Sequence, residues 1–420
     1  MTPKRVVILG GGFGGVAAAR SLKHADAEVL IIDRRNHHIF QPLLYQVATA
    51  VLAPSDVAAP LRQLTQKQPN LSVLLGEVTD IELAARRVKV SSPALPVTAV
   101  PFDYLVVATG VRPTYFGHDE FAQFAPSLKT ITDAESIRGR ILSAYEMAEQ
   151  MVEAAERARA LTFILVGAGP TGVELAASIA QMAQITLRSN FRRINPADTK
   201  ILLIEGAGRV LPTFSEALSS KAARHLGRLG VQVRTGVIVE RVDASGVWVA
   251  GQLIESDTVL WTAGVQASPL IKQLGVKTDR AGRAMVDELL DIPGHPDAFV
   301  IGDASAVVRN EHPLPGVAQV AIQEGTFVGR LIAARIAGRS YTAEFRYRDR
   351  GNMAVVGKNF AVLERGKLQM SGTLTWVLWA LIHVMFLPQV QNRLRVQMQW
   401  LWSYFTGQRG SRLIPEPRHL

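Results

Sequence analysis

Residues 6–15 read VVILGGGFGG and residues 163–172 read FILVGAGPTG. In each, an apolar run enters a G-x-G-x-x-G sequence that opens a helix, which is the arrangement of a βαβ unit that binds a dinucleotide. The glycines permit a tight turn, and the N–H groups at the helix start attract the pyrophosphate. Two such motifs predict two dinucleotide sites in one chain of the doubly wound α/β class. The residues predicted to form the two loops are Gly10, Gly12, Phe13, Gly14 and Gly15 in the first motif and Gly167, Gly169, Thr171 and Gly172 in the second.

An acidic residue at the end of the next strand is the second part of each motif. Asp33 closes the apolar run 28–33 at the usual interval of about 20 residues and is predicted to bind a ribose hydroxyl pair. Glu205 closes the run 200–205 after a longer interval. A carboxylate there accepts from a free 2′-hydroxyl and repels a 2′-phosphate, which favours NADH over NADPH, although the nearby Arg209 could hold a phosphate. The alternative for both acids is a solvated carboxylate at a strand end.

The composition excludes several kinds of chemistry. The chain has 420 residues, 48% of them hydrophobic, which is enough for two or three domains. It contains no cysteine, so disulfides, thiolate nucleophiles and iron–sulfur clusters are excluded. Its nine histidines show no spacing typical of metal ligands, so no metal site is predicted. Because the first strand begins almost at once, no signal peptide is expected, and the protein should stay in the compartment where it is made.

Two related sequence segments lie on either side of the second motif. The apolar run 102–107 continues into ATGVRP at 108–113, and the run 258–261 continues into TAGV at 262–265. This is the pattern of one domain inserted into another. Within the insertion, residues 132–160 predict one long helix. The predicted boundaries are 1–115 and 266–344 for the first nucleotide-binding domain, 116–265 for the second and 345–420 for a C-terminal region.

The strand ends of the first domain supply further predicted cofactor contacts. Thr109 and Gly110 lie in the segment 108–113, just after the predicted strand at 102–107, and Gly302 and Asp303 follow a later apolar run. Ligands of open α/β sheets bind at the carboxyl ends of the strands, so we expect these four residues beside the first nucleotide. Taken alone, Asp303 is more typical of the N-cap of a helix.

The C-terminal region is basic and amphipathic. From residue 345 to residue 420 it holds eleven Lys or Arg and three acidic residues, and so most of the net charge of +10. Its apolar run 374–387 is shorter than the roughly 20 residues that cross a bilayer. In 394–405, apolar residues recur at helical spacing beside basic and aromatic ones. The region is therefore predicted to be a monotopic anchor on an anionic lipid surface, with a dimer interface or core helices as the alternative.

Five stretches of the chain carry a family pattern. They are 10–15 (GGGFGG), 40–49 (FQPLLYQVAT), 169–174 (GPTGVE), 210–212 (VLP) and 318–325 (AQVAIQEG). These stretches, and nearly the whole chain with them, resemble the type II NADH dehydrogenases, single-chain FAD enzymes that reduce membrane quinones without pumping protons. Ala50 departs from the pattern, since Gly is expected there.

The resemblance implies an architecture and a set of partners. The fold would be two doubly wound nucleotide-binding domains, the NADH domain inserted in the FAD domain, plus a C-terminal amphipathic membrane-anchoring segment. FAD would be bound non-covalently, NADH would be the substrate, and ubiquinone or menaquinone would be the acceptor. The protein would be a homodimer on the cytoplasmic face of the membrane, held peripherally.

The resemblance also assigns roles to polar side chains. Glu174 is expected in the nicotinamide pocket near the flavin, where a carboxylate could orient the carboxamide or relay a proton. Gln319 and Gln323 lie at i and i+4 on a helix that a Pro-Gly pair should initiate, so their amides share one face and suit the carbonyls of a quinone. Ala318 and Gln319, at the start of that helix, would bring its positive dipole near the flavin. By spacing alone, Glu174 would only complement a helix dipole, and two such glutamines are typical of a solvated face.

The expected reaction is hydride transfer from NADH to FAD followed by two-electron reduction of a membrane quinone. The cofactors carry this chemistry, so a chain without cysteine can perform it. The same absence excludes relatives that reduce disulfides or oxidise sulfide, which need a cysteine pair beside the flavin. A nucleic-acid-binding flavoprotein is disfavoured, because the positive charge accompanies tryptophans and aliphatic residues. The remaining alternative is a soluble NADH-dependent flavoprotein reductase that passes electrons to a small protein carrier, which leaves the apolar tail unexplained.

Overall fold

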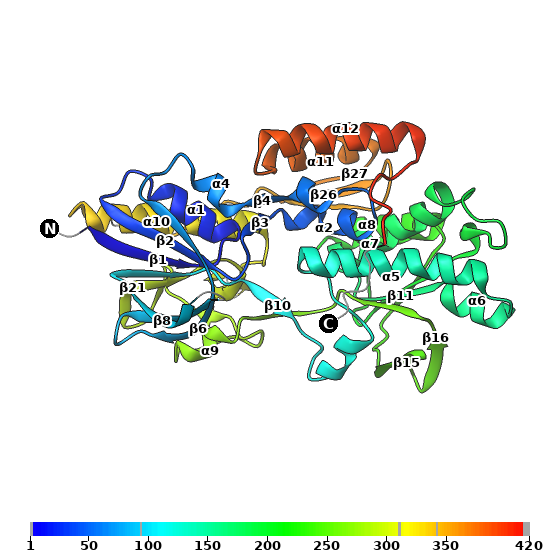
Figure 1. Ribbon diagram of the computed structural model, residues 1–420, viewed down its shortest axis with the longest axis horizontal. Coiled ribbons are helices and arrows are strands. Elements are labelled where there is room, and N and C mark those ends of the chain that lie inside the picture. The colour runs from blue at the N-terminus through cyan, green and yellow to red at the C-terminus, as the bar shows by residue number, and fades with distance from the viewer. Residues whose placement is uncertain (1–2, 93–94, 310–311, 342, 415–420) are drawn as a thin grey trace. The chain divides into compact units, whose positions relative to one another are not determined.

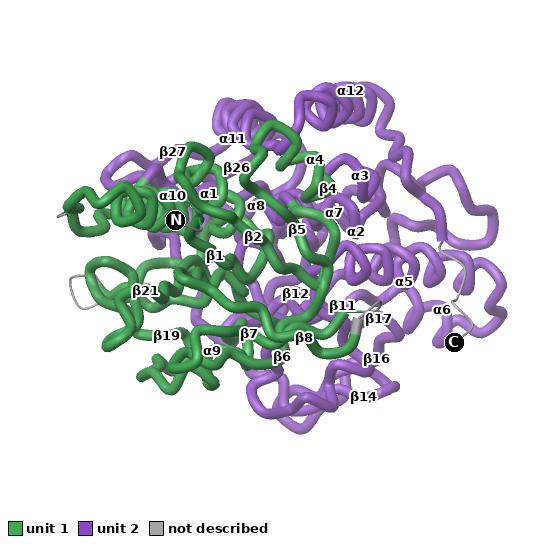
Figure 2. Tube along the Cα trace, turned by 60° about the vertical axis from the view of Figure 1, so that its left-hand side comes forward, with its two compact units in different colours: residues 1–39, 58–112, 265–349 green, residues 40–57, 113–264, 350–420 purple. Residues whose placement is uncertain are grey.

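The computed structural model of the chain describes residues 3–92, 95–309, 312–341 and 343–414 (Figure 1). It divides into two compact units (Figure 2). The first unit comprises residues 1–39, 58–112 and 265–349, and the second comprises residues 40–57, 113–264 and 350–420. Residues 40–57 and 350–420 therefore join the unit that contains the second glycine motif. Which unit binds FAD and which binds NADH stays a prediction.

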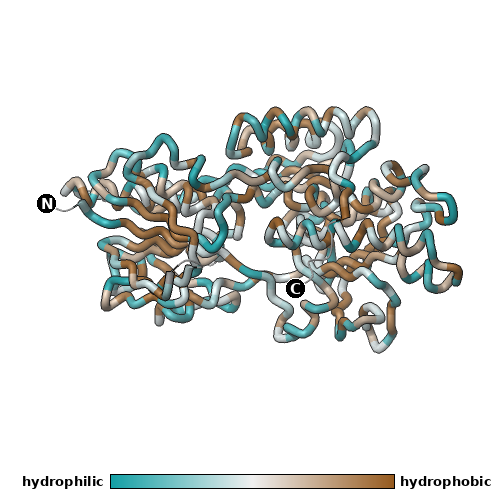
Figure 3. Tube along the Cα trace, viewed as in Figure 1, coloured by the Kyte–Doolittle hydropathy of each residue, from teal (hydrophilic) through white to brown (hydrophobic). Residues whose placement is uncertain are grey.

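A six-stranded sheet forms the centre of the first unit. Its order is β20-β21-β9-β1-β2-β5, and all neighbours are parallel except β20 and β21. In Figure 3 these strands are among the most hydrophobic segments of the unit, as expected of parallel strands covered on both faces. The strands are β1 (Lys4–Leu9), β2 (Ala27–Asp33), β5 (Leu71–Leu75), β9 (Tyr104–Val107), β20 (Asp291–Ile292) and β21 (His295–Val300).

Helices cover one face of this sheet and a three-stranded meander covers the other. Ile8 of β1 packs with α1 (Phe13–Ser21) and α10 (Ala318–Ile336), whereas its neighbour Leu9 packs against the meander β6-β7-β8. This alternation follows from the two-residue period of a strand. The other elements of the unit are β3 (His37–Ile39), β4 (Ala58–Pro60), α4 (Leu61–Thr65), β6 (Glu77–Glu82), β7 (Arg87–Ser92), β8 (Leu95–Pro101), α9 (Leu270–Gln273), β19 (Ala284–Met285), η5 (Gly302–Ala304), β22 (Ser305–Ala306), β23 (Val308–Arg309) and β24 (His312–Pro313).

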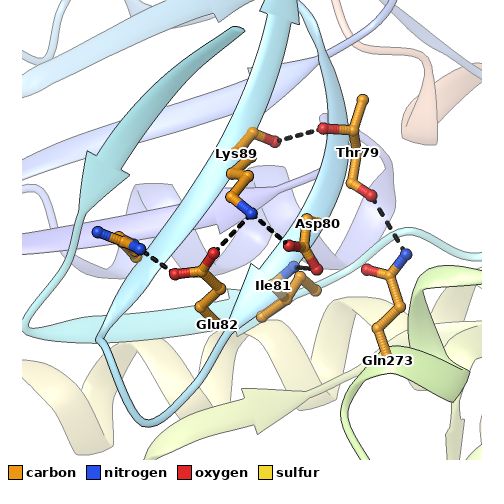
Figure 4. A network of polar contacts seen from close by, with 7 residues as sticks. Thr79, Asp80, Ile81, Glu82, Lys89 and Gln273 are labelled. Carbon is orange, nitrogen blue, oxygen red and sulfur yellow. Dashed lines mark hydrogen bonds and ion pairs between the residues drawn. The ribbon is translucent and has the colours of Figure 1, made fainter.

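A network of polar contacts lies on the solvent side of the meander (Figure 4). The Lys89 ammonium lies 2.9 Å from a carboxylate oxygen of Asp80 and 2.7 Å from one of Glu82, and the Gln273 side chain donates to the Thr79 carbonyl oxygen. These charged side chains are partly exposed, so water and salt screen their attraction. The network lies on the surface of the meander and is not a candidate functional site.

A four-stranded parallel sheet, in the order β13-β12-β11-β17, forms the centre of the second unit. The second glycine motif joins β11 to α7 within it, so the unit repeats the strand–loop–helix arrangement of β1 and α1. The predicted α/β class is confirmed. The strands are β11 (Thr162–Val166), β12 (Lys200–Glu205), β13 (Val231–Thr235) and β17 (Thr258–Trp261), and the helix is α7 (Pro170–Gln181).

The predicted long helix at 132–160 is wrong, because it is two helices. α5 (Ile131–Gln150) begins with a capping box between Thr130 and Asp133, and α6 (Ala154–Ala160) follows after a break. At the break, the Arg193 guanidinium donates to the carbonyl oxygens of Gln150, the last residue of α5, and of Met151, which follows it. These carbonyls lack partners inside the helix, so a long-range contact ends it where the composition would have continued it.

The C-terminal part of the second unit is an antiparallel sheet, β25-β26-β27, followed by two helices. α12 (Val390–Thr406) is held to the unit by hydrogen bonds from Asn392 to the Asp56 carbonyl oxygen (2.9 Å) and from the Trp400 indole to the Gln46 side-chain oxygen (2.7 Å). No helix in the described part of the chain combines the length and the apolar character that crossing a bilayer requires. The remaining elements are η1 (Gln41–Leu43), α2 (Leu44–Ala48), α3 (Pro54–Val57), η2 (Asp119–Gln123), η3 (Met182–Thr186), η4 (Pro196–Asp198), α8 (Glu216–Arg228), β14 (Arg241–Asp243), β15 (Gly246–Val249), β16 (Gln252–Glu255), β25 (Asn352–Val355), β26 (Ala361–Arg365), β27 (Leu368–Gly372) and α11 (Thr373–Phe386), with β10 (Val111–Pro113) and β18 (Val265–Ala267) at the two connections between the units.

Ala50, where the family pattern has glycine, keeps the backbone that glycine would favour. It follows α2 with φ +60° and is fully buried. The left-handed region costs a residue with a Cβ roughly 1–2 kcal/mol. Ala50 therefore adopts a backbone conformation that glycine would adopt without this strain.

Candidate functional site

The first glycine loop excludes side chains at two positions. Gly10 has φ +105°, and a Cβ there would lie 2.5 Å from the carbonyl oxygen of Ala108. A Cβ at Gly15 would lie 1.9 Å from the carbonyl oxygen of Gly10. A Cβ at Gly12 would have no protein atom within 4 Å. The loop is thus tight on its protein side and open at the helix start, where a pyrophosphate can approach.

The second glycine loop repeats this geometry. Gly167 has φ +102°, and a Cβ there would lie 2.6 Å from the backbone nitrogen of Ala263. A Cβ at Gly172 would lie 1.9 Å from the carbonyl oxygen of Gly167, whereas one at Gly169 would meet no protein atom within 4 Å. Both motifs therefore form the loop that their sequences predict.

The two strand-end acids also occupy equivalent positions. Asp33 accepts a hydrogen bond from the backbone N–H of Gly11 at 2.7 Å, and Glu205 accepts one from that of Ala168 at 2.6 Å. Each acid thus fixes the residue that follows the first glycine of its own motif. Their predicted binding to ribose hydroxyls stays a prediction.

Other residues of the first unit fit the FAD that the resemblance implies. The hydroxyl of Thr109, just after β9, is buried and has no hydrogen-bond partner among the residues that the structure describes. Asp303 lies in η5, which Gly302 enters with φ +69°. Gly316 leaves space beside Asp303, since a Cβ there would lie 3.3 Å from the carboxylate. An unpaired hydroxyl and a carboxylate at strand ends suit the hydroxyl groups of a flavin dinucleotide.

Glu324, in α10, is a buried acid that the sequence analysis did not single out. Its side chain is 0% exposed, and one carboxyl oxygen accepts from the backbone N–H of Gly302 at 2.5 Å. The other oxygen has no partner in the described chain. Burial raises the pKa of Glu324 to about 8, so the group is mostly protonated at neutral pH. It supports the turn that carries Asp303, and its only signal in the sequence was its place in the stretch 318–325.

The two predicted quinone-binding glutamines lie on α10 of the first unit. Gln323 both donates to the Arg348 carbonyl oxygen (3.0 Å) and accepts from the Arg348 N–H (2.9 Å). Its amide therefore ties α10 to the segment after it, and a quinone carbonyl would have to displace one of these bonds. Roles for Gln319 and Gln323 in binding quinone stay predictions.

A cavity of about 150 Å³ lies within the second unit. Elements α2, α7, α11 and α12 and the loop after β25 surround it, so it gathers residues from distant parts of the chain. Its aromatic lining residues are Trp376, Trp379, Trp400 and Tyr404, and its polar ones include Tyr45, Gln46, Glu174, Ser178, Lys358 and Arg409.

Glu174 is the acid of this cavity. Its carboxyl group accepts a long hydrogen bond, 3.3 Å, from the backbone N–H of Val355. Burial raises the pKa of Glu174 to about 8, only partly offset by that bond. A carboxylic acid that keeps its proton at neutral pH can act as a general acid. This is one of the two roles that the resemblance assigned to it.

The cavity also contains a hydrogen-bonded chain that sequence reasoning missed. The Trp400 indole donates to the Gln46 side-chain oxygen at 2.7 Å, and the Gln46 amide donates to the Tyr45 hydroxyl at 3.0 Å. Lys358 donates to the Tyr404 carbonyl oxygen at 2.7 Å. The stretch FQPLLYQVAT marked Tyr45 and Gln46 as part of a family pattern, but nothing local in the sequence links them to α12.

Comparisons with known proteins agree with this arrangement. The family model described as pyridine nucleotide-disulphide oxidoreductase matches residues 4–325. Two curated proteins of Mycobacterium tuberculosis, the type II NADH:quinone oxidoreductases Ndh and NdhA, are each 42% identical to the chain. Each alignment covers 98% of this chain, with 90% of Ndh and 89% of NdhA.

A solved structure of NDH2 from Plasmodium falciparum in complex with NADH has the same fold. Its TM-score is 0.89 at 19% sequence identity, over 97% of this chain and 99% of that one. Since the family model spans more than half of the chain and the mycobacterial relatives align over nearly all of it, the chain belongs to the pyridine nucleotide-disulphide oxidoreductases and, among them, to the type II NADH:quinone oxidoreductases.

Proposed function

We propose that the protein oxidises NADH and reduces a membrane quinone, with FAD bound in the first unit, NADH bound at the second glycine loop, and the quinone head group received by the cavity of the second unit. The observation that carries this proposal is the cavity itself. It combines aromatic walls, which suit a planar ring, with Glu174, a carboxyl group that is protonated at neutral pH. Ubiquinone and menaquinone heads both meet this description.

FAD, when bound, supplies a centre that accepts a hydride from NADH and returns two electrons to the quinone. The chain binds and orients the reactants. The glycine loops would hold the two pyrophosphates, and Asp33 and Thr109 would hydrogen-bond the first nucleotide. Conversion of a quinone to a quinol also consumes two protons, and the presence of Glu174 in the cavity lining supports it as the donor of one of them.

Glu205 supports NADH rather than NADPH as the donor. Its carboxylate holds the second loop and would repel a 2′-phosphate. The alternative prediction, that the site accepts NADPH, rested on Arg209. The guanidinium of Arg209 donates to the Pro212 carbonyl oxygen at 3.0 Å. That bond holds one end of Arg209 to the backbone, which favours Glu205 as the residue that sets the preference.

An exposed apolar face on α11 and α12 supports binding to a lipid surface. The face is contiguous at helical spacing, with Arg393 and Arg395 at its side, and Phe405 is 79% exposed. Because both helices also line the cavity, a quinone could enter from the bilayer. The membrane side would be the cytoplasmic one, where NADH is available, and a homodimer could share the same face. The exposed residues are Leu374, Val377, Leu381, Met385 and Phe386 on α11 and Val390, Leu394, Met398, Leu401, Trp402 and Phe405 on α12.

Charge placed on this face should release the protein from membranes. Met398→Glu together with Phe405→Glu should lower partitioning to vesicles of anionic lipid by about 100-fold, because two apolar side chains no longer enter the interface. Sedimentation with vesicles measures this. High salt alone should release little wild-type protein, since apolar burial is not screened.

A matched control is available on the same unit. Val152 and Ile238 are as exposed as the test residues, at 75% and 74%, but belong to neither α11 nor α12. Val152→Glu together with Ile238→Glu should leave binding intact, and equal release by both pairs would contradict the assignment. Point substitutions are preferable to removal of the tail, because Trp379, Leu387 and Val396 are buried in the unit.

The reaction can be tested directly on purified holoenzyme. The protein should be yellow and should reduce both a short-chain quinone and ferricyanide with NADH under anaerobic conditions. Gln319→Leu distinguishes the two predicted quinone sites: quinone reduction slowed about tenfold or more, with ferricyanide reduction preserved, would assign the quinone to α10, and unchanged quinone reduction would leave it to the cavity of the second unit. Reduction of ferricyanide without any reduction of quinone would instead support the soluble reductase that serves a small protein carrier.

A further inference from the structure

Arg409 places a buried positive charge beside the cavity. It follows α12, whose C-cap Gly407 has φ +70°, and it is only 6% exposed. Its guanidinium donates to the carbonyl oxygens of Thr49 (2.7 Å) and Ser178 (2.9 Å). Both acceptors are neutral, and no carboxylate in the described part of the chain lies within 4 Å of this guanidinium.

A buried cation without a counter-charge is costly, and most proteins pair it. Burial lowers the pKa of Arg409 to about 10, which still leaves it charged at neutral pH. Glu174 is the one acid among the cavity's described lining residues, and its pKa of about 8 keeps it mostly neutral. Lys358 adds a second cation to the lining. The lining of the cavity is therefore positively charged at neutral pH.

The volume and walls of the cavity restrict what can balance this charge. At about 150 Å³ the cavity has room for a small planar aromatic group such as a quinone head, and not for a larger ligand. Trp376, Trp379 and Trp400 offer faces for stacking. Arg409 is one of the residues that line the cavity, so a negative charge on a ring bound beside it would be stabilised.

We propose that the cavity binds the anionic form of a small aromatic ring of the quinone class, with Arg409 as its counter-charge. This rests on the proposed function, which gives the cavity to the quinone head. The ionised form of an acidic hydroxyquinone is one such anion. The other is the quinolate, which forms when a quinone gains two electrons and one proton. A second proton, which Glu174 can give, converts the quinolate to the quinol.

The test compares two ring compounds of similar size on the oxidised holoenzyme without NADH. 2-Hydroxy-1,4-naphthoquinone is ionised at pH 7, and 2-methyl-1,4-naphthoquinone is neutral. Quenching of tryptophan fluorescence reports their binding, since three tryptophans line the cavity. Wild-type protein should bind the anion about tenfold more tightly or better. Arg409→Gln should lose this preference but keep its affinity for the neutral compound, and Arg409→Lys should keep part of the preference.

Two further variants test whether Arg409 is the cation responsible for the preference for the anionic compound. Arg224 is exposed on α8 and does not line the cavity, so Arg224→Gln should keep the full preference. Lys358→Gln should weaken the preference less than Arg409→Gln does, and the reverse order would overturn the proposal. Equal wild-type affinities for the two compounds would also overturn it, even if Arg409→Gln did not fold. Failure of both compounds to bind wild-type protein would refute the assignment of the cavity to the quinone, and this inference with it.

Discussion

Gly172→Ala should abolish use of NADH while FAD stays bound, and Gly15→Ala should give a protein that has lost its flavin. In each loop the new Cβ would lie 1.9 Å from a backbone carbonyl oxygen, so the helix start must move away from the loop. The helix start is also where the pyrophosphate binds. We expect kcat/KM for NADH to fall at least about 100-fold in Gly172→Ala, or ~2.7 kcal/mol of transition-state stabilisation. Flavin absorbance and NADH-dependent reduction of ferricyanide measure the two losses separately.

Two other glycines provide controls for this pair. Gly227 lies in α8, and a Cβ there would have no protein atom within 4 Å, so Gly227→Ala should change neither activity nor flavin content. Gly169 is equally open on its protein side. Because only the nucleotide would meet a Cβ there, Gly169→Ala should leave stability unchanged and weaken NADH binding. Loss of flavin from Gly172→Ala with NADH binding retained would reverse the proposed assignment of the two sites.

The loops and acids could be predicted because their constraints are local. Gly10 and Gly167 must adopt positive φ within a few residues of their strands, and only glycine does so without strain. Asp33 and Glu205 bind backbone atoms of the same βαβ unit. The glycines are constrained within a few residues, and each acid contacts the loop of its own motif, so the motif alone determines these positions.

The cavity could not be predicted, since it depends on contacts between distant segments. The bond from Trp400 to Gln46 joins residues that are 354 positions apart. The division of the helix at 151–153 likewise depends on Arg193, which lies some 40 residues further on. Gln323 shows a different limit. Its i, i+4 spacing from Gln319 correctly predicted that both residues lie on one face of a helix. Spacing carries no information about the backbone of Arg348, which hydrogen-bonds the Gln323 amide.

Glu174→Gln should slow quinone reduction by about 100-fold at pH 7 and leave ferricyanide reduction largely intact. Glutamine keeps the size of the side chain and removes the proton that the carboxyl group can give, and general acids contribute about 10²–10⁴ in rate. In wild-type protein the quinone rate should fall about tenfold per pH unit above pH 8, as Glu174 loses its proton. The variant should lack this fall. If instead the variant raised KM for NADH with both acceptors, Glu174 would orient the carboxamide, the other role that the resemblance allows.

Stability supplies an independent check on the protonation of Glu174. Its pKa in the folded protein is raised from 4.5 to about 8, so between these values the folded state holds a proton that the unfolded state has lost. The free energy of unfolding should therefore decrease as pH rises through this window, by up to about 4 kcal/mol for this group. Glu174→Gln should remove that decrease, measured by urea unfolding at pH 5 and pH 9. Glu324 has a similarly raised pKa in the other unit, so Glu324→Gln should change the pH dependence of stability in the same way. Only Glu174→Gln should remove the fall in quinone reduction above pH 8, because only Glu174 lines the cavity.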